Sequence, residues 1–79
     1  MDRINQRTNH LLGYNIKLLR IEHKLRNKDI IAQLQLRGID ISSSTYAKME
    51  SGVNNPSVDL IMALKAIYDC DYSDFFKEL

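Results

Sequence analysis

Three kinds of side chain in this sequence could carry catalytic or metal chemistry: the serine run 42–44, the histidines His10 and His23, and Cys70. A serine nucleophile needs a histidine base that a carboxylate orients, and neither this arrangement nor an oxyanion-hole motif accompanies the serine run. The histidines have no further ligands at metal-binding spacing, so we expect both on the surface. A single cysteine allows no internal disulfide and no cysteine-based zinc site. The sequence therefore predicts no enzyme, no metal site and no cofactor.

The charged residues are unevenly distributed along the chain. Residues 1–48 carry nine basic and four acidic side chains, a net charge of +5, whereas residues 49–79 carry two basic and six acidic ones, a net charge of −4. This split favours a cationic face suited to a polyanion or an acidic partner. The alternative is a soluble surface whose charge is uneven by chance.

The size and composition predict one small folded domain. A chain of 79 residues and 9.2 kDa, with 44% apolar and 27% charged residues, has an ordinary globular composition. No apolar run approaches the ~18 residues of a membrane-spanning helix. The polar residues 1–10 lack the apolar segment of a signal peptide, so we expect a cytoplasmic protein without a membrane partner. Residues 1–10 are predicted to be a polar N-terminal arm, and residues 11–79 the folded domain.

The apolar spacing is helical throughout, which predicts an all-α fold of five helices. The first helix follows a cap at Thr8 or Asn9 and ends near residues 24–26. The second begins near Asn27 and ends at Gly38, as glycine favours at a helix C-terminus. The residues of this second helix that are expected to face inward are Ile30, Ile31, Leu34 and, as a further candidate, Leu36.

A capping residue precedes each of the three remaining helices. Ser42 caps a helix over residues 43–51, because its hydroxyl can accept a hydrogen bond from the amides of the first turn. Ser57 caps the fourth helix in the same way. Asp71 and Asp74 resemble an acidic capping box that starts a short fifth helix. This last helix bears the aromatic pair Phe75 and Phe76, of which one is expected in the core.

Three motifs in this order resemble the Cro/C1-type helix-turn-helix family, also called the XRE family. Residues 13–20 (Gly-Tyr-Asn-Ile-Lys-Leu-Leu-Arg) are similar to the opening of the family, Gly-x-x-Ile-x-x-Leu-Arg. Residues 41–57 follow its central Val-Ser-x-x-Thr-Ile-x-x-Ile-Glu-x-Gly-x-x-x-Pro-Ser, and residues 71–76 its ending. The resemblance implies a compact five-helix bundle of the lambda-repressor-like type, a helix-turn-helix domain over residues 11–79.

The sequence departs from the family pattern in three places. Arg26 and Asn27 stand where the family usually carries Thr-Gln, and Lys24 takes a usual glycine position. The connector between the second and third helices, which includes residues 35–40, is longer than in the shortest family members. The longer connector loosens the tight turn after which the motif is named.

The resemblance implies that the third helix lies in the major groove of double-stranded DNA. Lys48 suits the O6 and N7 atoms of guanine, while hydroxyls can donate to or accept from several bases. A polar helix face that meets only solvent is the alternative. The residues carried over as base-facing are Ser43, Ser44, Thr45, Ala47 and Lys48.

Phosphate contacts are expected at the start of the second helix, where free amides and the positive end of the helix dipole favour an anion. Family members also often touch the DNA backbone in the turn after the third helix. The alternative is that these side chains face only solvent. The candidate phosphate contacts are Arg26, Asn27, Lys28, Ser51 and Asn54, with Arg3 and Arg7 as further cations on the arm.

One further pair has a structural role in the family. The residues that match Arg20 and Glu50 commonly form a salt bridge between the first and third helices, so we expect them to hold the fold rather than to bind DNA. In the same way Cys70 falls at an apolar family position and is expected in the core.

The resulting interpretation is a sequence-specific DNA-binding transcriptional regulator. We expect a repressor that occupies its operator as a homodimer, with dimer contacts from the fourth and fifth helices. The alternative is a protein-interaction module, for example antitoxin-like, that retains the fold with weak or no DNA binding. The near-zero net charge and the long connector favour this alternative.

Overall fold

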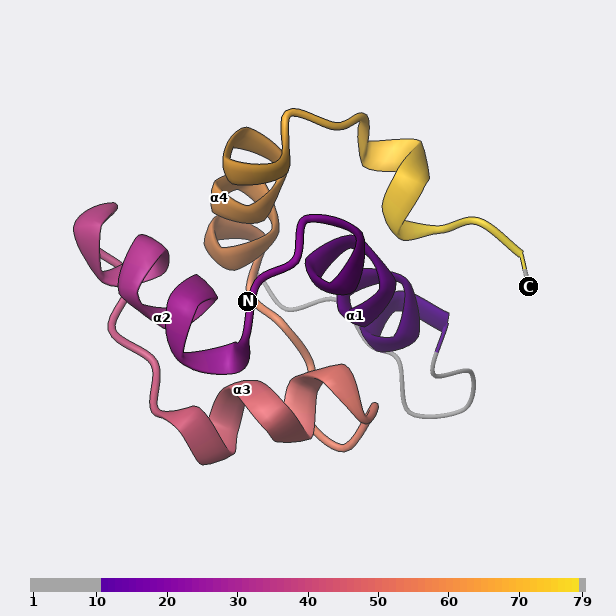
Figure 1. The fold of residues 1–79 in the computed structure, drawn as a ribbon. Helices are drawn as coiled ribbons and strands as arrows, with labels where there is room; N and C mark the ends of the chain where they lie inside the picture. The colour runs from indigo at the N-terminus through magenta and orange to yellow at the C-terminus, as the bar shows by residue number, and fades with distance from the viewer. Residues whose placement is uncertain (1–10, 79) are drawn as a thin grey trace.

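The computed structural model describes residues 11–78, which form one all-helical domain (Figure 1). The elements are α1 (Leu11–Glu22), α2 (Asn27–Leu36), α3 (Ser43–Glu50), α4 (Val58–Tyr68) and the 3₁₀ helix η1 (Tyr72–Phe75). No β-strand occurs in residues 11–78, so the all-helical prediction is confirmed there. The polar arm, His10 and the caps expected at Thr8 or Asn9 lie outside the described residues.

The prediction of five α-helices was wrong at its last element, because η1 is a four-residue 3₁₀ helix. Two backbone hydrogen bonds span it, from Asp74 N–H to Asp71 O at 3.0 Å and from Phe76 N–H to Ser73 O at 3.1 Å. Both join residues three apart, which is the 3₁₀ pattern, and the segment is too short to establish the longer-range α pattern.

All three predicted caps are present. Each N-cap residue exchanges a hydrogen bond with the residue three positions later, as the capping pattern requires. The caps are Thr45 N–H to Ser42 Oγ at 3.2 Å, Leu60 N–H to Ser57 Oγ at 3.1 Å and Asp71 N–H to Asp74 Oδ2 at 3.0 Å. The helix α3 ends at Glu50, one residue earlier than predicted, and Ser51 is its C-cap.

Left-handed residues follow α1 and α2. Gly38, with φ of 84°, follows the C-cap of α2 as predicted, since glycine adopts this conformation without a Cβ clash. Lys24, with φ of 58°, has the same handedness in the turn after α1. Leu36, the further candidate for an inward position, is exposed instead. It lies two residues after the buried Leu34 and is therefore on the opposite side of α2.

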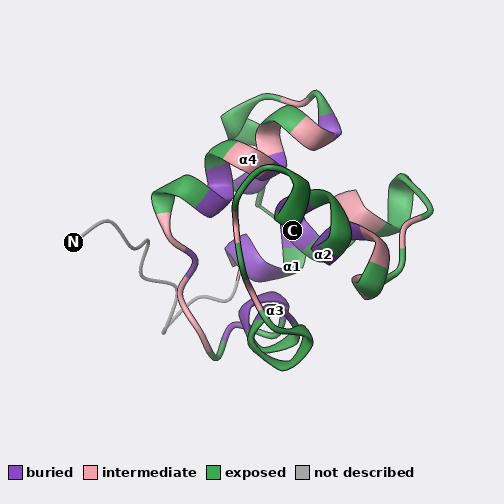
Figure 2. Ribbon diagram, turned by 90° about the vertical axis from the view of Figure 1, so that its left-hand side faces the viewer, coloured by how far each residue is buried: buried purple, intermediate pink, exposed green. Residues whose placement is uncertain are grey.

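The core forms where the inner sides of the helices meet, shown in purple in Figure 2. The helix α1 packs against α3 and η1, and α2 packs against α3 and α4. Asn15 attaches η1 to α1, because its buried side-chain amide donates to Phe75 O at 3.0 Å and to Lys77 O at 2.9 Å. The buried hydrophobic residues are Leu12, Ile16, Ile30, Ile31, Leu34, Tyr46, Met49, Leu60, Ile61, Leu64, Tyr68 and Phe75.

The expectations for the aromatic pair and for His23 are confirmed, and the one for Cys70 is confirmed in part. Phe75 is fully buried and Phe76 is exposed, as expected for one core phenylalanine of the pair. Cys70 is half-buried and packs against the core, and His23 is exposed. Among residues 11–78, no helix has both the length and the apolar character that crossing a membrane requires.

Candidate nucleic-acid interface

The outer side of α3 is polar and exposed. The inner side of the helix is held in the core by the buried residues Tyr46 and Met49, which fixes the direction of the opposite side. Figure 2 shows this division along α3, with green on its outer side. The five residues expected to face bases all lie on the exposed side: Ser43, Ser44, Thr45, Ala47 and Lys48.

Three hydroxyls on or next to α3 already take part in intramolecular hydrogen bonds. Ser42 Oγ donates to Thr45 Oγ1 at 2.9 Å while it accepts from the Thr45 amide. Ser51 Oγ donates to the carbonyl of Lys48 at 2.9 Å. A phosphate contact from the Ser51 hydroxyl would therefore have to replace this bond, whereas the ammonium group of Lys48 forms no ion pair within residues 11–78.

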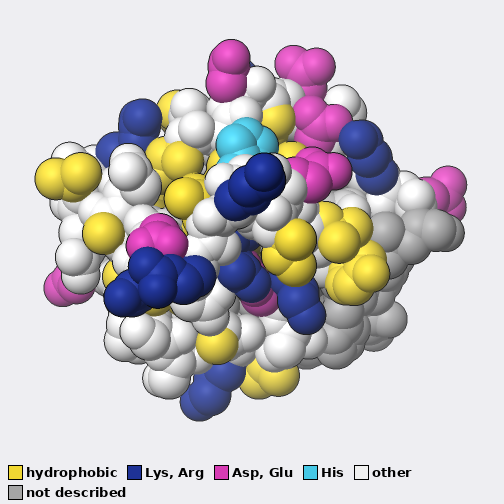
Figure 3. All heavy atoms as spheres, viewed as in Figure 1, with side chains coloured by type: hydrophobic (Ala, Val, Ile, Leu, Met, Phe, Trp, Pro, Cys, Tyr) yellow, Lys and Arg dark blue, Asp and Glu magenta, His cyan; other side chains and the backbone are white. Residues whose placement is uncertain are grey.

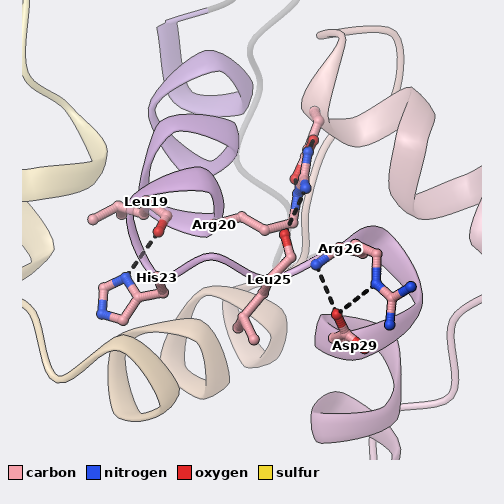
Figure 4. A network of polar contacts seen from close by, with 7 residues as sticks. Leu19, Arg20, His23, Leu25, Arg26 and Asp29 are labelled. Carbon is pink, nitrogen blue, oxygen red and sulfur yellow. Dashed lines mark hydrogen bonds and ion pairs between the residues drawn. The ribbon is translucent and has the colours of Figure 1, made fainter.

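The start of α2 carries a carboxylate as well as basic groups. Asp29 Oδ2 accepts from the Arg26 amide at 2.9 Å and from Arg26 Nε at 3.2 Å, as Figure 4 shows. These bonds, with the backbone bond as the larger cause, lower the pKa of Asp29, so its carboxylate is charged at neutral pH. Arg26 is thus already paired, and of its neighbours Lys28 is exposed and forms no ion pair within the described part of the chain.

A hollow joins the start of α2 to one side of α3. Its lining includes Lys17, Asn27, Ala47 and Ser51, together with the Arg20–Glu50 pair. Three candidates are therefore brought together: Asn27 of α2, Ala47 of α3 and Ser51, the C-cap of α3. From the sequence, Lys17 was not identified as a candidate contact. Its spacing could have indicated it, because Lys17 lies three residues before Arg20 and therefore on the same side of α1.

Asn54 lies on the other side of α3. It lines a depression together with Thr45 and Met49, and its side-chain Nδ2 donates to Thr45 O at 3.5 Å. The structure therefore does not bring Asn54 together with Asn27 and Ser51. The candidate phosphate contacts instead flank α3 on both sides.

A buried ion pair holds α3 in this position. Arg20 Nε and Nη2 donate to the two carboxylate oxygens of Glu50 at 2.8 and 3.1 Å, and Nη1 donates to Leu25 O at 2.9 Å (Figure 4). The hydrogen bond to Glu50 raises the pKa of Arg20. The predicted structural pair is therefore formed in the structure.

Two buried tyrosines lie in the core, Tyr46 on the inner side of α3 and Tyr68 at the end of α4. The hydroxyls of Tyr46 and Tyr68 are buried and form no hydrogen bond with any described residue. Burial raises the pKa of both phenols, so both are neutral at physiological pH. The ring of His23 lies 4.7 Å from that of Tyr68, centroid to centroid, and its Nδ1–H donates to Leu19 O at 2.8 Å.

Comparison with known proteins agrees with this geometry. A protein-family model described as helix-turn-helix, of the Cro/C1 or XRE type, matches residues 16–75. The chain belongs to the Cro/C1-type helix-turn-helix family. No curated protein and no solved structure gives a significant match.

The helix-turn-helix assignment covers the whole candidate interface. The matched range runs from the middle of α1 to the end of η1, so it includes all candidate contacts from Lys17 to Asn54. The family is one of DNA-binding regulators and is typically non-enzymatic. The two helices that give the motif its name are α2 and α3, and here they are joined by residues 37–42.

Proposed function

We propose that the chain is a sequence-specific transcriptional regulator that inserts α3 into the DNA major groove and represses by occupying an operator. The observation that carries this proposal is the exposed polar side of α3, opposite a side that is held in the core. Lys48 supplies the strongest direct contact, because its ammonium group can donate to guanine O6 and N7. Ser43, Ser44 and Ala47 are short side chains that read few bases, so sequence-dependent DNA shape supplies part of the specificity.

Contacts to the DNA backbone orient α3 in the groove. Lys17, Asn27 and Lys28 lie on the side of α1 and α2, and Asn54 lies on the other side of α3. Phosphates on both sides of a major groove can then be bound at once. Such contacts fix the register of the protein on the duplex without reading its sequence.

The proposal includes binding as a homodimer. One module of this size buries a limited DNA surface, and helix-turn-helix proteins reach higher affinity by reading two half-sites about one helical turn apart. Two copies related by a two-fold axis would match a palindromic operator.

Fluorescence anisotropy tests the proposal. The labelled probes are a duplex from upstream of the protein's own gene and a random duplex of equal length, each titrated at several salt concentrations. We expect tighter binding to the upstream duplex and a steep fall of affinity with salt, whose slope reports the number of phosphates contacted. Equally weak binding to both duplexes would contradict operator recognition, and no binding at low salt would exclude DNA as the partner.

A second candidate function is protein interaction, which exposed apolar side chains on α1 favour. Tyr14, Leu18 and Ile21 are 44%, 36% and 51% exposed and, at spacings of four and three, lie along one side of the helix. In Figure 3 hydrophobic side chains also form a patch just to the right of the centre. If the chain is a protein-interaction module, Lys48→Ala leaves binding of the protein partner unchanged. If it is a DNA-binding regulator, the same substitution weakens DNA binding.

A further inference from the structure

The long connector after α2 and the outer side of α4 form a shallow groove. Arg37, Gly38 and Ile39 line it from the connector, and Asp59, Met62, Ala63 and Ala66 line it from α4. In Figure 2 the connector runs down the near side of the bundle, from α2 past α4 to α3. None of the residues proposed to contact DNA lines this groove, so a partner could occupy it while α3 is bound to DNA.

Apolar side chains are exposed in and beside the groove. Met62 is 53% exposed on the α4 wall, and Leu36, which directly precedes Arg37, is 82% exposed. A single exposed apolar residue is ordinary on a protein surface. Here two large apolar side chains lie in or beside the same groove. The other lining residues include two alanines and a glycine, whose small size leaves space for a side chain from a partner.

The groove also carries one charge of each sign, on opposite walls. Arg37 lies on the connector wall and Asp59 on the α4 wall. Neither side chain forms an ion pair with any residue of the described part of the chain. Opposite charges on opposite walls make the surface complementary to itself, because a two-fold rotation can place the basic wall of one copy against the acidic wall of another.

We propose that this groove is the surface through which two copies of the chain associate. Arg37 of each copy pairs with Asp59 of the other, and Met62 of each copy packs into the groove of the other. The inference rests on the proposed function in so far as that function needs a dimer, and it names the surface that forms it. The long connector, which loosens the turn between α2 and α3, then has a role of its own, because it builds one wall of the interface.

The apolar stripe on α1 is the competing surface for self-association. It has more exposed apolar side chains, and the exposed charges beside it on the same helix are Lys17 and Glu22. The groove differs because its two charges lie on opposite walls with small residues between them, which leaves space for a side chain of the second copy. We therefore choose the groove, and a variant of the stripe serves as the competing arm of the test.

Sedimentation of the full chain without DNA tests this interface by charge reversal. We expect the wild type to form dimers, and Arg37→Glu and Asp59→Arg each to raise the dimer dissociation constant about tenfold or more. The double variant Arg37→Glu/Asp59→Arg restores a pair of opposite sign, so its dissociation constant should return toward that of the wild type. Arg37 is the C-cap of α2 and Asp59 lies in the first turn of α4, so each charge interacts favourably with its helix dipole and each substitution destabilises the folded chain. A dimer that is recovered in the double variant therefore cannot result from a more stable monomer.

Lys24→Glu is the matched control, since it makes the same change of charge outside the groove and should leave the dimer intact. Circular dichroism of each variant establishes that it is folded. A wild type that is monomeric at all concentrations would overturn the inference. So would a dimer that resists both reversals, or one that only Ile21→Lys on the α1 stripe disrupts.

Anisotropy with operator DNA separates this inference from the proposed function. A protein that stays monomeric but prefers its operator would contradict the groove interface and leave the regulator proposal standing. A dimer that responds to the charge reversals but binds no DNA would support the interface and contradict the regulator.

Discussion

Arg20 of α1 binds both carboxylate oxygens of Glu50 of α3, and its remaining terminal nitrogen donates to Leu25 O in the turn before α2. One guanidinium therefore connects the three elements that surround the candidate interface. The Arg20 and Glu50 side chains are only 14% and 7% exposed, so solvent screens their interaction little. Removal of either partner leaves the other as a buried charge without compensation.

We predict that Glu50→Ala lowers the free energy of unfolding by about 3 kcal/mol, with a similar loss for Arg20→Ala. Urea titration followed by circular dichroism measures the change. Arg26→Ala is the control: the Arg26 side chain is 72% exposed in its pair with Asp29, and such surface pairs contribute at most about 1 kcal/mol. Equal, small losses in all three variants would contradict a structural role for the buried pair.

Acid should weaken the first turn of α2. Because the hydrogen bonds from Arg26 lower the pKa of Asp29, the unfolded chain binds a proton more readily than the folded one. The stabilisation from this carboxylate is therefore fully present above its ordinary, unfolded-state pKa and is lost as the pH falls through its lower folded-state pKa.

We predict that Asp29→Asn lowers the urea midpoint at pH 7 and that its difference from the wild type shrinks as the pH falls below about 4. Urea titrations from pH 7 to pH 2 measure the effect. The control is Asp40→Asn, because the exposed Asp40 side chain forms no hydrogen bond or ion pair with the described residues. A difference between Asp29→Asn and the wild type that stayed constant with pH would contradict this explanation.

The helix starts were predictable from the sequence because capping is local. Ser42 and Ser57 each lie three residues from the amide they cap, so the interaction needs no other part of the fold. The inner positions of α2 followed from spacing for the same reason, except at Leu36, where the turn of the helix carries the side chain away from the core.

The surroundings of the site depended on how the helices pack together. Lys17 lies beside Asn27 and Ser51 only because α1 and α2 both pack against α3, and no spacing within one helix reports this. The groove at Arg37 and Asp59 likewise joins a connector without periodicity to a helix that starts about twenty residues later in the chain. The pairing of Arg20 with Glu50 was expected only through the family resemblance.

The left-handed residue after α1 offers a stabilising substitution. Lys24 has φ of 58°, a conformation in which a Cβ is strained and glycine is not. We predict that Lys24→Gly raises the free energy of unfolding by about 0.5–1 kcal/mol, because the relieved strain exceeds the extra chain entropy of glycine. Lys24→Ala keeps the strain and should bring no such gain, and a gain shared by both would point to the lost charge instead. Urea titration measures both variants.

Lys48 should determine specificity rather than general affinity for DNA. It is exposed on the outer side of α3 and forms no ion pair within residues 11–78. If its ammonium group reads guanine, Lys48→Ala lowers operator affinity by about 1–3 kcal/mol and leaves binding to random duplex changed far less. Anisotropy with both duplexes measures the ratio. Equal losses on the two would show that Lys48 contacts phosphate.

Lys17 should show the opposite behaviour. It lies in the hollow between α1, the start of α2 and α3, beside the side chains of Asn27 and Ser51 rather than on the outer side of α3. A phosphate bound there would release about one counterion, so Lys17→Ala should weaken binding to operator and random duplex alike and reduce the slope of log affinity against log salt by about 1. Lys65→Ala is the control, because Lys65 lies over the ring of Tyr72 at 5.2 Å, away from this hollow. A slope that Lys17→Ala leaves unchanged would mean that the hollow holds no phosphate, and the DNA backbone would then have to be bound through Lys28 and Asn54.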